Sequence, residues 1–411
     1  MASITVDRKR LLGALKVADG LVSGGTIRDV KLEKIGVDLR LVATDYETSI
    51  MLAIASDRVE GGGASLTVDA RRLLSVLREI KTVEVDLAFS GCEPTRGPDA
   101  PPRRLDVRSL GSAVSIVAGS PDDFPVIDAP NVAGGIVLPV GDVLALVDET
   151  SYAAAAERSR YAMHGLRLEN GHGRLRAVAT DGRRLAVSER NVAANGVDGT
   201  GPGKLGGHGI VPLKALAVLE AVLRWTPGDG VALKFNAVPV LVDSEKESAT
   251  RLNVRAERAE FSTRLVEGQY PEWEAVVPVP SESPVLVDSE AFRAAVRQAM
   301  MLVDDAKRSV RLVIRPGRLE VRGRSAGVGG GESVTEVPVE YTGAARFAAF
   351  NPDFLLDALP TRARGRGAAE PVVALHLKTW DTAAAIVAPN GAKAVLMPVT
   401  LGDEKEVEKT L

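Results

Sequence analysis

Two short stretches, LVATDYETSI at 41–50 and AVATDGRRLA at 177–186, decide how this sequence folds. Each begins with an apolar run typical of a strand and then reaches a Thr-Asp pair. The carboxylate of Asp181 could be catalytic, could belong to an anion-binding loop with the two arginines that follow, or could be a turn residue. Because Asp45 occupies the same place in the first stretch, we favour a local role, in which a short carboxylate accepts backbone N–H groups as the strand turns.

The Thr-Asp motif belongs to a longer internal repeat with a period of roughly 140 residues, which suits whole duplicated domains. The repeats open with SITVDRKRLLGALKVADGL, GIVLPVGDVLALVDETSYA and PVLVDSEAFRAAVRQAMML. Each opening predicts a short strand, an acidic residue near a helix start and an amphipathic helix. Paired strands follow, with predicted hairpin turns at Gly36, Asn170-Gly171 and Pro316-Gly317. A second helix and further strands complete each repeat.

The repeats predict an α+β fold of three tandem similar domains, each with two helices on antiparallel sheets of about eight short strands in all. The first two repeats end alike, in VAGSPDDFPVIDAP and LVEGQYPEWEAVVPVP, and these apolar exits predict interdomain linkers. We place the domains at 1–131, at 132–282 including the linker to the third domain, and at 283–401. The charged tail at 402–411 is expected to be disordered.

The composition excludes several classes of protein. With 411 residues, 45% of them hydrophobic and 26% charged, the chain has the composition of a soluble multidomain protein. The single cysteine, Cys92, allows no intramolecular disulfide, which suits a reducing cytoplasm. No uncharged run is longer than APNVAGGIVLPVG, which is well short of the roughly 20 apolar residues that span a bilayer, so we expect neither export nor membrane insertion.

The motifs that could support catalysis fail on inspection. GTGPGKLGGHG has Leu205 where a phosphate-binding loop needs Ser or Thr, and GRSAG at 323–327 is not followed by the helix that a nucleophile elbow requires. The four histidines are scattered without metal-ligand spacing. A triplicated scaffold favours a binding surface over a single reaction centre, so we expect no catalytic site, no metal and no cofactor.

Basic residues concentrate on the predicted helices. The first helix carries Arg8, Lys9, Arg10 and Lys16, and the second helices and their edges carry Arg71, Arg72, Arg78, Lys81, Lys214 and Arg224. Such side chains along one surface would bind phosphates without reading sequence, although charged helix faces are often only solvated. The net charge of −3 is compatible with a basic stripe that acidic surface elsewhere balances.

The threefold repeat and three motifs in order, ATDGRRLA, EGQYPEWEAVVP and VLMPVTL, closely resemble the β subunit of bacterial DNA polymerase III, the sliding-clamp family. The resemblance covers residues 1–401. It implies a DNA-clamp fold that forms a homodimeric ring, a non-enzymatic processivity factor that encircles duplex DNA independently of sequence. The implied partners are the DNA polymerase III alpha subunit, clamp loader subunits and other proteins with a clamp-binding motif.

The resemblance also implies three sets of site residues. The DNA-binding set is Arg28, Arg71, Arg72, Arg160, Tyr161 and Lys214. The peptide-binding pocket is Met163, Thr180, Gly182, Arg183, Arg184, Leu185, Pro271, Val276, Val395, Leu396, Met397, Pro398, Val399 and Leu401, and part of VLMPV could equally be core strand. The dimer interface includes Met301 and Leu302, for which ordinary core is the alternative.

Two departures from the family pattern accompany the resemblance. The loop GGTIRDVKLEKIG differs from the usual segment after the first helix, which puts the DNA contact of Arg28 in question, and the tail GDEKEVEKTL extends beyond the usual end. Two alternatives to a clamp remain from the sequence alone: a peptide-binding scaffold that does not bind DNA, and an enzyme with a site between repeats.

Overall fold

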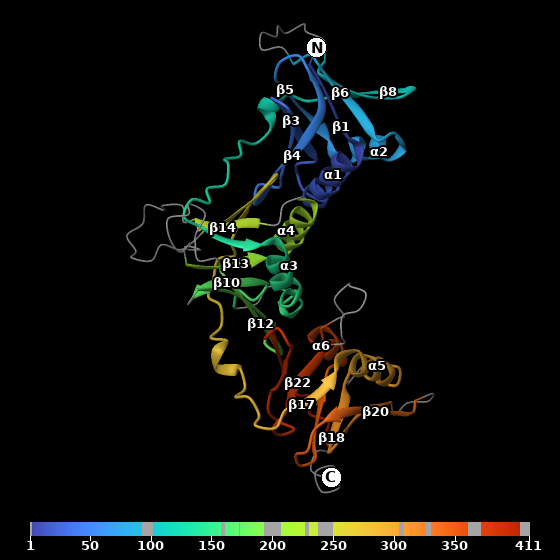
Figure 1. Ribbon diagram of the computed structural model, residues 1–411, viewed down its shortest axis with the longest axis vertical. Helices are drawn as coiled ribbons and strands as arrows, with labels where there is room; N and C mark the ends of the chain where they lie inside the picture. The colour runs from blue at the N-terminus through green and yellow to red at the C-terminus, as the bar shows by residue number, and fades with distance from the viewer. Residues whose placement is uncertain are drawn as a thin grey trace. The chain divides into compact units, whose positions relative to one another are not determined.

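The computed structural model describes residues 2–92, 102–157, 161–171, 173–192, 207–226, 230–236, 250–303, 308–325, 330–360 and 371–402. Two compact units are present: the first joins Met1–Leu144 with Asn191–Val266, and the second joins Ala145–Arg190 with Glu267–Leu411. Figure 1 shows the elements of each unit. No helix in the ranges just given is long and apolar enough to cross a membrane.

Each third of the chain contributes the same series of elements. The first third has β1 (Ala2–Asp7), α1 (Arg8–Val22), β2 (Asp29–Ile35), β3 (Asp38–Thr44), β4 (Thr48–Glu60), β5 (Ala64–Asp69), α2 (Ala70–Glu79), β6 (Glu84–Ser90), β7 (Arg104–Ser109) and β8 (Ser112–Val117). The second has β9 (Ile136–Pro139), α3 (Val140–Asp148), β10 (Gly165–Gly171), β11 (Arg174–Thr180), β12 (Arg184–Asn191), β13 (His208–Pro212), α4 (Leu213–Trp225), β14 (Gly230–Asn236), β15 (Arg251–Ala256) and β16 (Ala259–Arg264).

The last third repeats the series again. It has β17 (Val285–Asp288), α5 (Ser289–Met300), β18 (Val310–Arg315), β19 (Arg318–Arg324), β20 (Glu332–Glu340), β21 (Arg346–Phe350), α6 (Pro352–Ala358), β22 (Val372–His376), β23 (Ala384–Val387) and β24 (Lys393–Leu396). Short 3-10 helices are η1 (Pro121–Asp123), η2 (Ser151–Ala153) and η3 (Glu274–Val276). Among the described residues, each third therefore has two α-helices and eight strands, which confirms the predicted α+β repeat.

Acidic or amide side chains begin four of the helices. The carboxylates of Asp7, Asp69 and Asp288 accept the N–H groups of Arg10, Arg72 and Ala291 at 2.7–2.8 Å. Asn351 accepts the N–H of Asp353 in the same way at α6. These N-caps satisfy donors that the first helical turn leaves free, and the apolar stripe of each helix then packs onto its sheet.

One predicted hairpin turn was wrong. Gly36 and Gly317 do lie in tight turns, with φ of 58° and 76°. Asn170 and Gly171 instead belong to β10 and pair with Leu175 and Arg174 of β11. The turn follows them, and Gly173, with φ of 74°, supplies the left-handed conformation that the Asn-Gly pair was expected to provide.

The sheets continue across successive repeats through one kind of strand pair. In the first unit, Thr48–Leu52 at the start of β4 pair antiparallel with Thr263–Ala259 of β16. In the second unit, Arg184–Val187 at the start of β12 pair with Leu396–Lys393 of β24. The corresponding start of β20 pairs with β19 alone, and β8 pairs with β7 alone, in the part of the chain that the structure describes.

Candidate functional site

The Asp181 corner joins β11 to β12 and is held together by its own side chains. The Asp181 Oδ1 atom accepts the N–H groups of Arg183 and Arg184 at 2.9 and 3.0 Å. The Thr180 hydroxyl donates to the carbonyl of Arg184 and accepts the N–H of Gly182. Gly182 has φ of 84°, which glycine adopts without steric cost.

The Asp45 corner, between β3 and β4, has the same bonds. Asp45 Oδ1 accepts the N–H groups of Glu47 and Thr48 at 3.2 and 2.8 Å, and the Thr44 hydroxyl donates to the carbonyl of Thr48 at 2.9 Å. The two corners therefore match bond for bond. This confirms that Asp45 and Asp181 are turn residues of the repeat.

The side chain of Arg184 is turned away from solvent and fixes the corner to neighbouring elements. Its guanidinium pairs with Asp181 at 3.0 Å and with Asp357 of α6 at 2.7 Å, and the side chain is only 13% exposed. It also lies over the rings of Tyr152 and Phe354, 5.6 and 4.3 Å from their centroids. Burial raises the pKa of Tyr152, so that hydroxyl stays neutral. Arg184 thus stabilises the corner, and little of its charge is accessible to a ligand.

The segment after β16 is tied to the second repeat beside this corner. The carbonyl of Gln269 accepts the N–H of Ala162 at 3.1 Å. The Tyr270 hydroxyl donates to the carbonyl of Val178, two residues before Thr180, at 3.1 Å. These bonds place Pro271, which follows Tyr270, and Met163, which follows Ala162, near the end of β11.

Arg176 of β11 holds η3 in place through an ion pair and through contact of its planar guanidinium with an aromatic ring. Its guanidinium pairs with Glu274 at 3.2 Å and lies 5.2 Å from the centroid of the Trp273 ring. The same side chain pairs with Glu169 at 3.1 Å and with Glu189. Burial raises the pKa of Glu189, but hydrogen bonds from Arg176 and Arg174 outweigh it and lower that pKa overall. The network therefore orders the short helix that carries Val276.

The predicted pocket residues divide into core and surface. Val395, Leu396 and Leu185 are at most 3% exposed and belong to the core, where the β12–β24 pair buries them. Met397 and Val276 are 47% and 55% exposed, unusually so for apolar side chains. The N–H of Met397 donates to the carbonyl of Arg183 at 3.0 Å, which joins the last strand to the corner.

The remaining pocket residues lie around these two. Thr180 is buried, Gly182 and Arg183 are exposed, and the partly exposed members are Met163, Arg184, Pro271, Pro398, Val399 and Leu401. The surface thus offers apolar side chains beside a few polar groups, including the exposed cation of Arg183. Such a surface can hold an extended apolar peptide.

The helices of the first unit form a basic layer. Helix α1 lies beside α2 and α4, and the indole N–H of Trp225 in α4 donates to the carbonyl of Arg10 in α1 (Figure 1). The exposed basic residues of the layer are Lys9, Arg10, Lys16, Arg71, Arg72, Arg78, Lys214 and Arg224, and they outnumber its acidic residues, Asp19, Glu79 and Glu220. This face suits a polyanion.

The predicted DNA-binding residues have differing surroundings. Arg28 and Arg72 are exposed, Tyr161 is 40% exposed, and Arg160 lies outside the described residues. Arg71 pairs with Asp19 at 3.2 Å while its side chain stays 68% exposed. Lys214 pairs with Asp45 at 2.6 Å, so it connects α4 to the first corner as well as facing solvent.

The predicted interface residues follow α5. Met301 is 76% exposed and Leu302 is partly exposed. A side chain as exposed as Met301 does not belong to a core, so the core alternative is wrong for this residue. An exposed methionine at a helix end is instead available for contact with another chain.

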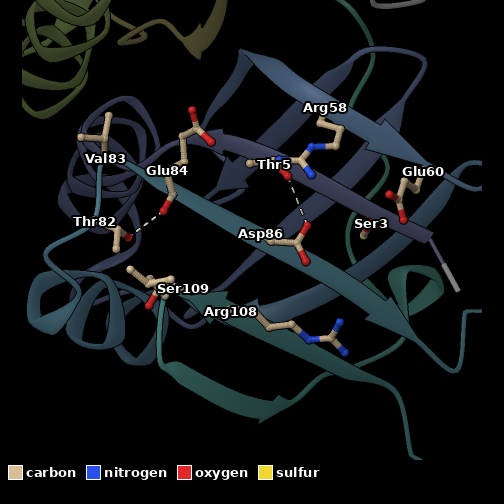
Figure 2. A pocket seen from close by; sticks show the side chains of 11 residues that line it. Ser3, Thr5, Arg58, Glu60, Thr82, Val83, Glu84, Asp86, Arg108 and Ser109 are labelled. Atoms are coloured by element: carbon tan, nitrogen blue, oxygen red, sulfur yellow. Dashed lines mark hydrogen bonds between the residues drawn. The ribbon is translucent and has the colours of Figure 1, made fainter.

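The described residues also line two surface cavities, the first of which borders Tyr152 and Asp357, the neighbours of Arg184. One, of about 770 Å³ in the second unit, is lined by Tyr152, Arg293, Asp357 and neighbours. Figure 2 shows the other, of about 570 Å³, on the strands β1, β4, β6 and β7, where Asp86 accepts the hydroxyl of Thr5. No cluster of metal-ligating side chains occurs among the residues with described positions.

The sequence did not reveal the residues that hold the site in shape. Glu169, Arg174, Arg176 and Glu189 alternate along strands and so share one sheet face, a signal that period-2 spacing could have given. The contacts of Arg176 with Glu274 and Trp273, about a hundred residues later, depend on where the chain returns, which spacing alone does not predict.

Comparison with known proteins gives one family. The family model of the DNA polymerase III beta subunit central domain matches residues 138–272, and that of its C-terminal domain matches residues 274–389, together more than half of the chain. The beta sliding clamp of Caulobacter vibrioides is 27% identical over 366 residues, which are 86% of this chain and 89% of that protein. The beta sliding clamp of Chlamydia muridarum is 24% identical over 403 residues, 97% of this chain and 99% of that protein.

Solved structures agree with this family. A sliding clamp from Pseudomonas aeruginosa bound to griselimycin has a TM-score of 0.78 and 25% identity, with 97% of this chain and 100% of that chain covered. The DNA polymerase III beta subunit of Thermotoga maritima also has a TM-score of 0.78, with 98% and 100% covered, and its 19% identity supports the fold.

The charge network around Glu189 makes stability depend on pH. Because the pKa of Glu189 is lower in the folded chain, its ionised form stabilises the fold above its unfolded pKa of about 4.3, and this contribution is lost as the pH falls through the folded value. We expect Glu189→Gln to reduce the free energy of unfolding by about 1 kcal/mol at pH 7 and by much less near pH 3, measured by urea denaturation.

The exposed Glu79 of α2 provides the matched control. Glu79→Gln should change the free energy of unfolding little at either pH. If Glu189→Gln reduced the free energy of unfolding equally at both pH values, the ionised carboxylate would not be what stabilises the network.

Proposed function

Since the chain belongs to the DNA polymerase III beta subunit family, we propose that it is the sliding clamp of its replicative polymerase. Two copies form a head-to-tail ring that encircles duplex DNA and slides along it. The ring tethers the polymerase and so makes synthesis processive. The chain acts without a catalytic site or cofactor of its own, and a separate ATP-driven loader opens and places it.

The repeated strand junction supports ring closure. The pairs β4–β16 and β12–β24 each join the start of one strand to the last strand of the following repeat. Among the described residues, the start of β20 pairs only with β19 and β8 pairs only with β7, so each lacks the second neighbouring strand that its counterparts have. An unpaired edge is a template for another strand, so β20 of one copy pairs with β8 of the next. Met301 and Leu302 lie at this junction.

The basic helix layer supports binding of duplex DNA. Arg28, Arg71, Arg72 and Lys214 of the first unit, with Arg160 and Tyr161, contact phosphates and read no sequence. Clustering of the exposed basic residues on the α1–α2–α4 layer favours this function over a peptide scaffold that does not bind DNA. Because each contact is weak and independent of sequence, the ring can slide while its closure prevents escape.

The surface around Met397 supports peptide docking. The exposed Val276 and Met397, with Met163, Gly182, Arg183 and Pro271, take the apolar side chains of a clamp-binding motif. Polymerase III alpha subunit, clamp loader subunits and repair proteins share this surface in turn. We place the three clamp domains at 1–131, 132–282 and 283–401, followed by a tail at 402–411, and the protein in the cytoplasm.

The junction geometry predicts which residues meet across the closed ring. Ser49 and Glu332 are equivalent because they pair with Thr44 and Arg324. Ala259 and Ser112 are equivalent because each is the first residue after its hairpin turn. The pair Met51–Glu260 therefore corresponds to Val334 and Ala113 of two different copies, and both of these side chains are exposed.

A disulfide tests this register. In a Cys92→Ser background, we expect Ala113→Cys with Val334→Cys to form a covalent, closed dimer on mild oxidation, visible on a non-reducing gel. The matched control, Ser115→Cys with Val334→Cys, is two residues out of register and should cross-link poorly. Equal cross-linking of both pairs, or a monomer that never cross-links, would contradict the proposed closure.

Replacement of Met397 tests the peptide surface. Met397→Asp places a charge where a partner's apolar side chain must bind, so the affinity for a peptide with the clamp-binding motif of the polymerase should fall roughly 30-fold or more. Fluorescence anisotropy measures the affinity and light scattering the dimer, which should persist. The exposed linker variant Val279→Asp is the control. Loss of the dimer together with peptide binding would show that Met397 is a core residue.

A further inference from the structure

Tyr46 has an unusual backbone conformation at the first corner. With φ of 74°, it is the one non-glycine residue with positive φ in the described ranges, and its side chain is 66% exposed. The matching residue of the second corner is Gly182, with φ of 84°. The corner thus requires a conformation that suits glycine, yet an exposed aromatic ring occupies it at an energetic cost. Such strained residues gather at functional sites.

Two arginines at the adjoining ends of β15 and β16 contact this corner, Arg251 through its side chain and Arg264 through its backbone. The N–H of Arg264 donates to the carbonyl of Glu47 at 2.9 Å, and the Arg251 guanidinium reaches the same carbonyl at 3.4 Å. Arg251 and Arg264 lie directly opposite each other on β15 and β16. Like charges in that arrangement repel, and burial together with Arg264 lowers the pKa of Arg251. A bound anion would relieve this repulsion.

The corner's remaining charges favour the same kind of ligand. Asp45 is paired with Lys214, and its side chain is only 9% exposed, so its negative charge is largely neutralised. A Cβ on Gly25 would lie 4.0 Å from the Asp45 Cβ, which places the loop that carries the exposed Arg28 beside the corner. The corner thus has one exposed carboxylate, Glu47, with the Arg251 guanidinium at its carbonyl and with Arg264 and the Arg28 loop as neighbours.

The second corner has different chemistry on the same backbone. Thr263 pairs with Thr48 as Leu396 pairs with Arg184, and the N–H groups of Arg264 and Met397 make the same bond to the corner carbonyl. The apolar Leu396 and Met397 thus correspond to Thr263 and Arg264. The first corner has an aromatic side chain and cations in place of an apolar surface. It therefore does not suit the apolar peptides proposed to bind at the second corner.

We propose that the Asp45–Thr48 corner is a binding site for single-stranded DNA, in which a base stacks on Tyr46 and the flanking phosphates contact Arg251, Arg264 and Arg28. An exposed tyrosine ring can stack on unpaired bases of any sequence, whereas the bases of duplex DNA are stacked on one another and leave no face free for it. This binding is separate from encirclement of duplex DNA, and it does not require that the dimeric ring be closed. On a primed template, it would hold the unpaired strand.

Binding of labelled oligothymidylate to the full chain, followed by fluorescence anisotropy, tests the site. Tyr46→Gly should weaken binding roughly 5- to 150-fold, the range for loss of one stacked base, while Tyr46→Phe should bind within about threefold of the parent. Tyr46→Gly should also raise Tm because glycine relieves the left-handed strain, so weaker binding would accompany greater stability. Duplex affinity should not change.

The arginines are tested by salt dependence. Arg264→Gln should reduce the slope of log affinity against log salt by about 0.7 for single strands, and Arg40→Gln, an exposed strand arginine on β3, should not. Parent-like binding by Tyr46→Gly, or a loss in Tyr46→Phe equal to that in Tyr46→Gly, would overturn the stacking site. Preference for oligoglutamate over oligothymidylate would overturn it in favour of an acidic peptide. Retention of the parent protein on circular duplex tests the ring separately.

Discussion

Backbone pairing between the start of one strand and the last strand of the next repeat is the constraint on which this structure depends. It occurs as β4 with β16 and as β12 with β24, with antiparallel registers of the same kind. Each pair satisfies N–H and C=O groups that would otherwise be open edges. In the proposed ring, the same kind of pairing would join β8 of one copy to the start of β20 of the next. Closure would then follow from the repeat itself and would need no separate interface sequence.

Because the ring is closed, the time that the protein remains on DNA does not depend on its affinity for DNA. The basic residues on α1, α2 and α4 supply attraction that salt screens and sequence does not alter. Contacts of this kind exchange readily, so they permit sliding. Retention follows from the ring's topology, which removes any need for strong individual contacts.

Duplication of the corner explains how one backbone serves two kinds of recognition. The Asp45 and Asp181 corners share their hydrogen bonds, so the fold is already specified by Thr-Asp and the following two N–H groups. Side chains that make none of those bonds can differ, at an energetic cost where the residue after the Asp is not glycine. Gly182 and Met397 give an apolar surface, and Tyr46 and Arg264 give an aromatic, cationic one.

Sequence reasoning predicted the local features of this fold and missed the distant ones. The repeat, the helix starts at Asp7 and Asp288 and the turn role of Asp181 follow from spacing because each rests on neighbouring residues. The Asn170-Gly171 turn was wrong because strand register moved the turn to Gly173. The inward orientation of Arg184 toward Asp357 depends on contacts that only the folded chain brings together.

The most direct test of a closed ring is the lifetime of the protein on DNA of different topology. The protein is loaded with its clamp loader onto nicked circular DNA, free protein is removed, and half of the sample is cut once with a restriction enzyme. The account predicts long retention on the circle and rapid loss from the linear duplex. Equal retention on both would contradict topological closure and would mean that direct contacts hold the protein on DNA.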